Sequence, residues 1–165
     1  MSKRIIVIGP GGAGKSYFSK RLASITNLPL YHLDNLFWID AKNHIPKEEF
    51  DKGLLEILKT DKWIIDGDYS RTYELRMEYA DTIYFLNFPL EVALQGVESR
   101  IGKPRDDNPW VEDSFDPEFK QWIIDWYKTK LPGVEHLLNK YKDTKTIIVF
   151  KSRDEMNEYL SKLEV

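Results

Sequence analysis

The chain has 165 residues, a formal net charge of −3, 42% hydrophobic residues and no cysteine. A chain of this length typically forms one domain, which we expect over 1–165, and it buries enough surface to fold without disulfides or metals. The lack of cysteine excludes disulfides, thiolate metal sites and thiol nucleophiles, and it suits the cytoplasmic location that we expect. Because the sequence has no basic stripe and no apolar run of ~18 residues, we expect neither direct nucleic-acid binding nor a membrane span.

The predicted elements alternate between short apolar strands and helices with apolar residues at helical spacing. In chain order, they are a strand at 4–9, a helix at 15–26, a strand at 27–34, a helix at 46–59, strands at 62–66 and 81–88, and a helix at 89–101. After a polar segment rich in Pro and Asp come helices at 118–128 and 133–142, a strand at 145–150 and a helix at 152–163. This order predicts an α/β fold, a five-stranded parallel sheet with helices on both faces.

Polar residues follow the ends of the predicted strands. Gly9–Ser16 follows the first strand, Asp34 the second, Asp66 and Arg71 the third, and Arg153 the last. In parallel α/β sheets, ligands bind beyond the carboxyl ends of the strands. We therefore expect the functional site at this edge of the sheet.

The stretch after the first strand fits the phosphate-binding loop pattern. It contains Gly9, Gly11, Gly12, Ala13, Gly14, Lys15 and Ser16, between a strand and a helix. Glycines allow backbone N–H groups to curl around phosphate oxygens at the positive end of the following helix. Lys15 is expected to reach the β- and γ-phosphates of ATP, and the Ser16 hydroxyl to bind Mg²⁺.

Two aspartates are candidates for the remaining metal and acceptor roles. An Asp at the end of an apolar strand beside a phosphate loop is where Mg²⁺ and its waters are held, and either Asp34 or Asp66 could serve. We favour Asp66 for the metal, which leaves Asp34 facing the group that accepts the phosphoryl. The aromatic pair Trp122 and Trp126, spaced i and i+4, is predicted to be helix core.

Three arginines supply further positive charge, namely Arg71, Arg100 and Arg105. Arginine is the preferred bidentate partner of phosphate, and phosphoryl transfer depends mainly on positioning and charge neutralisation. We therefore assign all three to catalysis. The polar segment that carries Arg105 predicts a lid at about 100–117, which would close to exclude water.

The sequence resembles small P-loop kinases of the adenylate kinase and shikimate kinase type. The stretch WIIDGDYSRT resembles the Asp-Gly-Phe-Pro-Arg-Thr of adenylate kinase, whose Arg contacts the acceptor phosphate. Together with HLDNLFW, it is closer still to the kinase-like proteins known as DNA topology modulation proteins. The resemblance implies a nucleoside monophosphate kinase-like P-loop NTPase fold, a short lid and an adenine pocket around Arg153. Tyr17 then stands where these kinases have Thr or Ser beside the phosphates.

These observations lead to three functional hypotheses. The first is ATP- and Mg²⁺-dependent phosphoryl transfer to a small acceptor by a monomer or weak dimer. We favour a nucleoside monophosphate because of Arg71, and a hydroxyl metabolite, with Asp34 as general base, stays open. The second is a nucleotide-binding regulatory protein of the topology-modulation type with weak or no turnover. The third is a simple NTPase.

Overall fold

The sheet of the protein is parallel throughout and has five strands in the order β2-β3-β1-β4-β5. The computed structural model describes residues 2–104 and 110–164. The strands are β1 (Arg4–Ile8), β2 (Leu30–His32), β3 (Trp63–Asp66), β4 (Thr82–Leu86) and β5 (Thr146–Phe150). The predicted α/β fold with a five-stranded parallel sheet is therefore confirmed.

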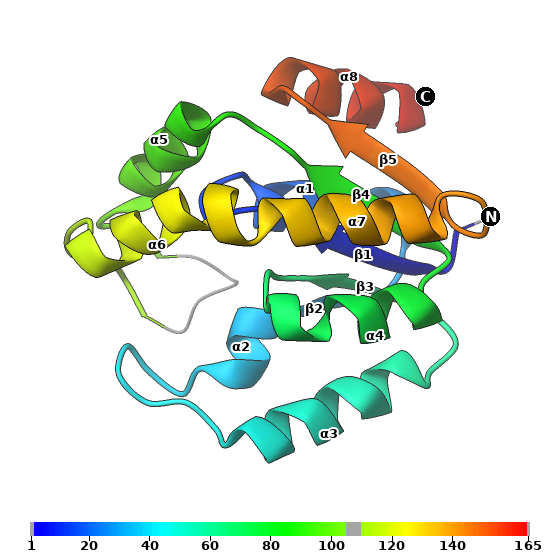
Figure 1. Ribbon diagram of the computed structural model, residues 1–165, viewed down its shortest axis with the longest axis horizontal. Helices are drawn as coiled ribbons and strands as arrows, with labels where there is room; N and C mark the ends of the chain where they lie inside the picture. The colour runs from blue at the N-terminus through cyan, green and yellow to red at the C-terminus, as the bar shows by residue number, and fades with distance from the viewer. Residues whose placement is uncertain (1, 105–109, 165) are drawn as a thin grey trace.

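Helices cover both faces of the sheet (Figure 1). They are α1 (Lys15–Thr26), α2 (Leu33–Phe37), α3 (Lys47–Leu58), α4 (Tyr73–Tyr79), α5 (Leu90–Arg100), α6 (Pro117–Thr129), α7 (Leu131–Tyr141) and α8 (Arg153–Leu163), with a short 3₁₀ helix, η1 (Ser70–Thr72), before α4. None of the helices in the described part of the chain is long and apolar enough to cross a membrane.

The core forms two layers because successive strand residues point to opposite faces. Ile6 and Ile8 of β1 pack on one face with residues of α3, α4, α6 and α7. Ile5 and Val7 pack on the other face with residues of α1 and α8. A third cluster joins α5 to α6 through Ala93, Val97 and Ile123. It lies at the end of the sheet where the strands terminate, next to the glycine-rich loop.

Two short helices differ from the sequence-based prediction. The predicted strand at 27–34 is confirmed only over Leu30–His32, because the chain turns into α2 at Leu33. Helix α4 was not predicted; it buries Tyr73, Arg76 and Met77. A single turn or two of helix carries too few apolar repeats to show a period in the sequence. Both helices lie just beyond strand ends. Helix α2 places Asp34 at the site, and Arg76 of α4 donates to the backbone that follows β3.

Candidate functional site

The glycine-rich loop wraps the amino end of α1. Gly12 and Gly14 have φ values of 81° and 102°, which L side chains rarely adopt, so the loop needs glycine at both positions. Lys15 folds over the loop, and its ammonium donates hydrogen bonds to the backbone oxygens of Gly9 (2.9 Å) and Pro10 (3.0 Å). The loop is therefore held in one shape by its own lysine.

Helix α5 lies directly against this loop. A Cβ at Gly96 would be 1.9 Å from the backbone oxygen of Gly12, and a Cβ at Gly12 would be 2.0 Å from that of Ala93. Arg153 joins the same contact, since its Nη2 donates to the oxygens of Gly12 (3.3 Å) and Val92 (3.4 Å). Gly96 was missed by the sequence-based reasoning, because a glycine within a helix carries no local signal of what packs against it.

A cavity of about 450 Å³ opens beside the loop, and we call it the donor cavity. Its lining includes most of the predicted nucleotide-binding residues, namely Gly11, Gly12, Gly14, Lys15, Ser16, Tyr17 and Arg153. Asp34, Asp66 and Arg100 line it too. The structure thus brings these residues together, although they come from distant parts of the sequence. Of the other two predicted arginines, Arg71 does not line this cavity, and Arg105 lies outside the described residues.

Asp66 is buried at the end of β3, where two hydrogen-bond donors hold one of its carboxylate oxygens. The Ser19 hydroxyl of α1 and His32 Nδ1 (2.7 Å) both donate to Asp66 Oδ2. Asp66 and the Ser16 hydroxyl line the same cavity, and hard oxygen donors of this kind suit Mg²⁺. Mg²⁺ usually takes only one or two carboxylates besides phosphates, so these two residues fit such an ion. The described residues contain no group of three or more His, Cys, Asp or Glu that could hold a metal.

The charge around Lys15 comes mainly from carboxylates. Burial lowers the pKa of the Lys15 ammonium, and the nearby charges of Asp68, Asp34 and Asp66 act in the opposite direction. Three acids, one from α2 and two from the end of β3 and the residues after it, therefore act on one lysine. A polyphosphate would therefore bring its metal ion into a site where carboxylates outnumber the cations.

Arg100 ends α5 and lies at the start of the predicted lid. Its Nε donates to Glu112 (3.2 Å), and its guanidinium lies 5.7 Å from the ring centre of Phe119. The backbone N–H of Gly102 also donates to the backbone oxygen of Glu112 (2.5 Å), so the described parts of this segment before and after residues 105–109 are bound to each other. Closure of the segment stays a prediction, and its residues 105–109 lie outside the described part of the chain.

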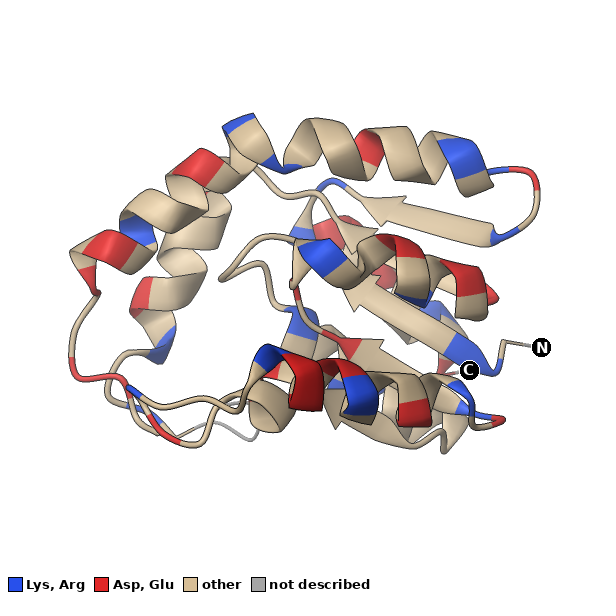
Figure 2. Cartoon of the chain, turned by 60° about the horizontal axis from the view of Figure 1, so that its bottom comes forward, with Lys and Arg blue, Asp and Glu red and all other residues tan. Residues whose placement is uncertain are grey.

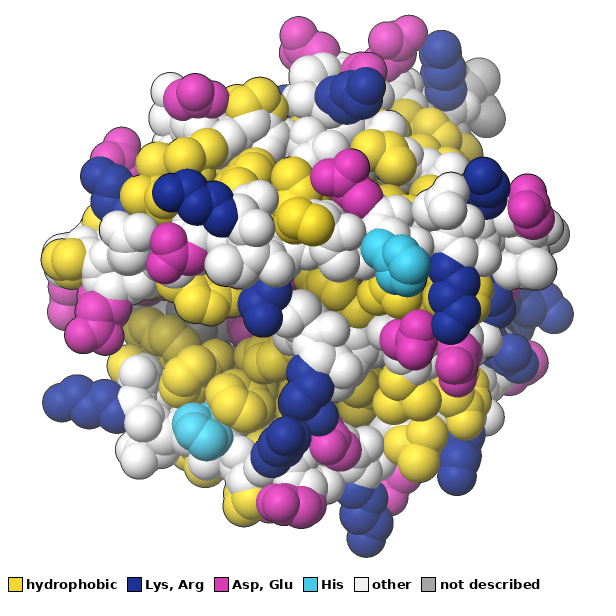
Figure 3. Space-filling model, viewed as in Figure 1, with side chains coloured by type: hydrophobic (Ala, Val, Ile, Leu, Met, Phe, Trp, Pro, Cys, Tyr) yellow, Lys and Arg dark blue, Asp and Glu magenta, His cyan; other side chains and the backbone are white. Residues whose placement is uncertain are grey.

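A second cavity, of about 670 Å³, lies on the other side of Lys15, and we call it the acceptor cavity. It shares three wall residues with the donor cavity, namely Gly11, Lys15 and Asp34. Figure 3 shows a hollow with hydrophobic side chains between α6 and the segment that follows α2. The Tyr69 hydroxyl donates to Asp34 Oδ1 (2.6 Å), and burial raises the pKa of Tyr69, so this donor keeps its proton near neutral pH.

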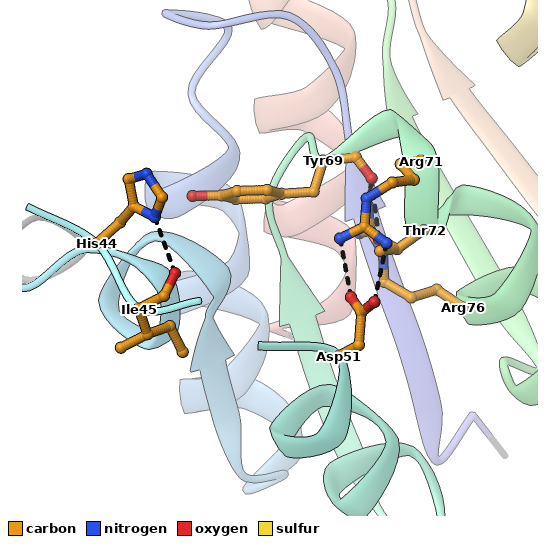
Figure 4. Close-up of polar contacts among 7 residues, drawn as sticks. All are labelled: His44, Ile45, Asp51, Tyr69, Arg71, Thr72 and Arg76. Carbon is orange, nitrogen blue, oxygen red and sulfur yellow. Dashed lines mark hydrogen bonds and ion pairs between the residues drawn. The ribbon is translucent and has the colours of Figure 1, made fainter. Parts of the chain in front are cut away.

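Arg71 lines the acceptor cavity but is bound to an acid. Its two terminal nitrogens bond Asp51 of α3 at 3.0 and 2.8 Å, as a two-pronged pair (Figure 4). Behind it, the buried Arg76 donates to Thr72 Oγ1 (3.0 Å) and to the backbone oxygen of Gly67 (3.0 Å). Burial lowers the pKa of Arg76. This buried arginine fixes the backbone that presents Asp66, Asp68 and Tyr69, and it was also missed by the sequence-based reasoning.

The two tryptophans of α6 have different environments. Trp126 is buried, as predicted, and its indole N–H donates to Asp68 Oδ1 (2.8 Å). The prediction of a core position is wrong for Trp122, which is 42% exposed and lines the acceptor cavity. Helical spacing places both residues on one side of α6, but the sheet covers only the part of that side nearest Trp126.

Comparison with solved structures shows the same fold in several kinases. A shikimate kinase from Acinetobacter baumannii in complex with shikimate has a TM-score of 0.61 and 18% identity, covering 98% of this chain and 90% of that one. A shikimate kinase from Bacteroides thetaiotaomicron has a TM-score of 0.56 and 18% identity (99% and 97% covered). A sugar kinase from a Janibacter species has a TM-score of 0.58 and 15% identity (99% and 91% covered). No protein-family model and no curated protein sequence matches the chain.

Proposed function

We propose that the protein transfers the γ-phosphoryl group of ATP to a hydroxyl group of a small acceptor. One observation carries this proposal: the donor and acceptor cavities meet at Lys15 and Asp34. A triphosphate on the loop would have its terminal phosphate at Lys15, next to the second cavity. The solved structures of the same fold include a shikimate kinase and a sugar kinase, which supports phosphoryl transfer to a small molecule.

Each residue at the junction has a role in this reaction. Lys15 moves from the loop carbonyls to the β- and γ-phosphates and balances charge on the transferred group. The acceptor oxygen attacks the γ-phosphorus, the bond from that phosphorus to the β–γ bridging oxygen breaks, and the hydroxyl proton passes to Asp34. Tyr69 holds the Asp34 carboxylate in place through its hydrogen bond. Ser16 and Asp66 are the residues that would hold Mg²⁺, which supplies charge neutralisation at the phosphates when bound.

A nucleoside monophosphate, favoured by the sequence alone, is the second candidate acceptor. It is supported by the presence of Arg71 in the acceptor cavity. A phosphate would need that guanidinium, but Asp51 already forms a two-pronged pair with it. Binding would therefore exchange one bidentate anion for another and leave Asp51 without its partner. A hydroxyl acceptor needs a carboxylate at the junction, where Asp34 lies, so the contacts favour it.

The test compares two matched substitutions. For a hydroxyl acceptor, Asp34→Asn lowers kcat by about 100-fold or more, the usual contribution of a general base, while Arg71→Lys leaves KM within about threefold. For a monophosphate the order reverses, since Lys keeps the charge but loses the two-pronged geometry. Asp61→Asn is the control, because Asp61 is exposed, pairs with Arg4 at the surface and lines neither cavity. ADP release is measured against a panel of hydroxyl compounds and monophosphates.

The alternative of a nucleotide-binding regulator of the topology-modulation type predicts binding without turnover. Lys15→Ala then weakens ATP binding, and no acceptor in the panel stimulates ADP release. Figure 2 shows Lys and Arg interspersed with Asp and Glu along the helices, and the formal charge is −3. This distribution supports a small-molecule partner over duplex DNA. Parent-like ATP binding and turnover in Lys15→Ala would refute the assignment of the loop itself.

A further inference from the structure

Aromatic rings line the acceptor cavity on both of its sides. Trp38 and Tyr69 come from the segments after β2 and β3, and Phe119 and Trp122 come from α6. The rings of Phe119 and Trp122 are close to parallel, with an angle of 22° and centres 6.1 Å apart. Two neighbouring rings in nearly one orientation present parallel faces on which a flat ligand ring can stack, unlike a cage that converges on a point.

Other side chains support these rings from behind. Tyr69 packs against Phe37 (centres 5.3 Å apart) and Phe50 (5.0 Å), and Trp38 packs edge-on against Phe37 (5.1 Å). The Phe119 ring also lies next to the loop, since a Cβ at Gly11 would be 3.1 Å from its tip. The walls are thus formed before a ligand arrives, so a ligand need not order them on binding.

The charges of the acceptor cavity disfavour an anion. Among the described residues that line it, four are carboxylates, Asp34, Asp68, Asp116 and Glu118, and three are cations, Lys15, Arg71 and Lys130. Two of the cations already have acceptors: Lys15 bonds the loop carbonyls, and Arg71 bonds Asp51. A carboxylate or phosphate on the acceptor would therefore face mostly acids. Like charges in a partly buried site oppose binding strongly.

The reacting end and the stacking surface belong to one cavity. Asp34 marks the end where the hydroxyl reacts, because that residue also lines the donor cavity. Trp122, 42% exposed, supplies the flat apolar surface. From the proposed function, on which this inference rests, we infer that the acceptor is uncharged, with a flat ring system at one end and a reactive hydroxyl at the other. Nucleosides have this chemistry, and they are the class that we propose.

The first experiment compares acceptors with the intact protein. ADP release is measured with four nucleosides, with their 5′-monophosphates, with inositol as an uncharged polyol without a flat ring, and with ethanolamine as a cationic hydroxyl compound. We expect at least one nucleoside to be used with a kcat/KM roughly tenfold or more above that of its monophosphate, of inositol and of ethanolamine. Preference for inositol, ethanolamine or a monophosphate overturns the inference and leaves phosphoryl transfer in place.

The second experiment tests the stacking surface by binding alone. Calorimetric titration with the best nucleoside, without ATP, is expected to show a Kd raised on the order of tenfold in Trp122→Ala, because stacking on an aromatic ring contributes to that extent. Trp122→Phe should retain most of the affinity, and the Kd for ATP should stay within about twofold in both variants. Tyr31→Ala is the matched control, since Tyr31 is 37% exposed on β2 and lines neither cavity.

The two experiments separate this inference from the proposed function. In one outcome, no compound stimulates ADP release, but a nucleoside binds and Trp122→Ala raises its Kd. The cavity then holds a flat ring, and the proposed phosphoryl transfer is refuted. In another outcome, an acceptor stimulates ADP release, and its Kd is the same for Trp122→Ala as for the parent protein. The inference about the flat ring then fails, while the proposed phosphoryl transfer stands. Absence of nucleoside binding to the parent protein likewise overturns the inference.

Discussion

Substitution of Gly96 by alanine should damage the phosphate loop although no residue of the loop itself is changed. The added Cβ would lie 1.9 Å from the backbone oxygen of Gly12 and 2.9 Å from Arg153 Nη2. Close carbon–oxygen contacts in proteins lie at roughly 3.3–3.6 Å, so α5 and the loop must separate by more than ~1 Å. The 1.9 Å contact joins a Cβ to a backbone oxygen, so it cannot be relieved by moving the end of a flexible side chain. The strain therefore passes into the loop backbone.

The size of the effect follows from overpacking. An extra methyl in a well-packed region costs about 1–3 kcal/mol, and a clash between two backbones lies at the upper end. A loss of about 3 kcal/mol, if it appears wholly in the loop geometry that binds phosphate, raises the Kd for ATP by roughly 100-fold. If it appears in global stability instead, Tm falls by roughly 6–12 °C for a chain of this size.

Calorimetry with ATP and a thermal melt measure the two parts. Gly133→Ala is the matched control, because Gly133 also lies in a helix and a Cβ there meets nothing within 4 Å. That variant should bind ATP like the parent and melt at the same temperature or slightly higher, since alanine favours helix. If Gly96→Ala matches Gly133→Ala in both Kd and Tm, the close approach of α5 does not shape the loop, and the reasoning is wrong.

Two further predictions concern stability. Arg76→Met removes the buried donors that bond Thr72 Oγ1 and the backbone oxygen of Gly67. The free energy of unfolding, measured in urea, should therefore fall by about 3 kcal/mol or more. Lys140→Met is the control, because it removes only the surface pair with Glu74 among the bonds compared and should cost less than about 1 kcal/mol. Burial raises the pKa of Tyr127 to about 12. Its unfolded form loses the proton near pH 10 and its folded form only near pH 12, so this residue's contribution is complete below about pH 10 and decreases as pH rises to about 12. Tyr127→Phe should flatten stability in that window, and an unchanged slope would contradict the assignment.

The phosphate loop and the sheet could be predicted because their signals are local. Consecutive residues from Gly9 to Ser16 carry the loop, and each strand is a short apolar run beside a turn. The aspartates at the strand ends followed from a rule of topology, since parallel strands end at one edge. Ligand-binding loops of this kind depend on residue types at fixed spacing, which a sequence displays directly.

The partners of these residues could not be predicted from the sequence. Asp51 lies on a helix remote from Arg71 in the chain, and only the folded arrangement turns Arg71 toward it. Likewise, Ser19 and His32 come from α1 and β2 and meet at Asp66 only in the packed structure. Trp122 was assigned to the core because helical spacing tells which residues share a side, not how far the neighbouring layer extends. Side-chain pairing and exposure are therefore set by tertiary packing.

The hydrogen bonds from Lys15 to Gly9 and Pro10 set a threshold for selectivity among nucleotides. A ligand must offer the ammonium better acceptors than two neutral carbonyls. The bonds to the carbonyls are already charge-assisted through the ammonium, so the gain from phosphate is the attraction of opposite charges, about 1 kcal/mol at ~4 Å in water and about 4 kcal/mol at an effective dielectric near ~20. A nucleotide whose phosphates stop short of the lysine gains nothing from this exchange. The loop would thus reject incompletely phosphorylated nucleotides before any part of the base is recognised.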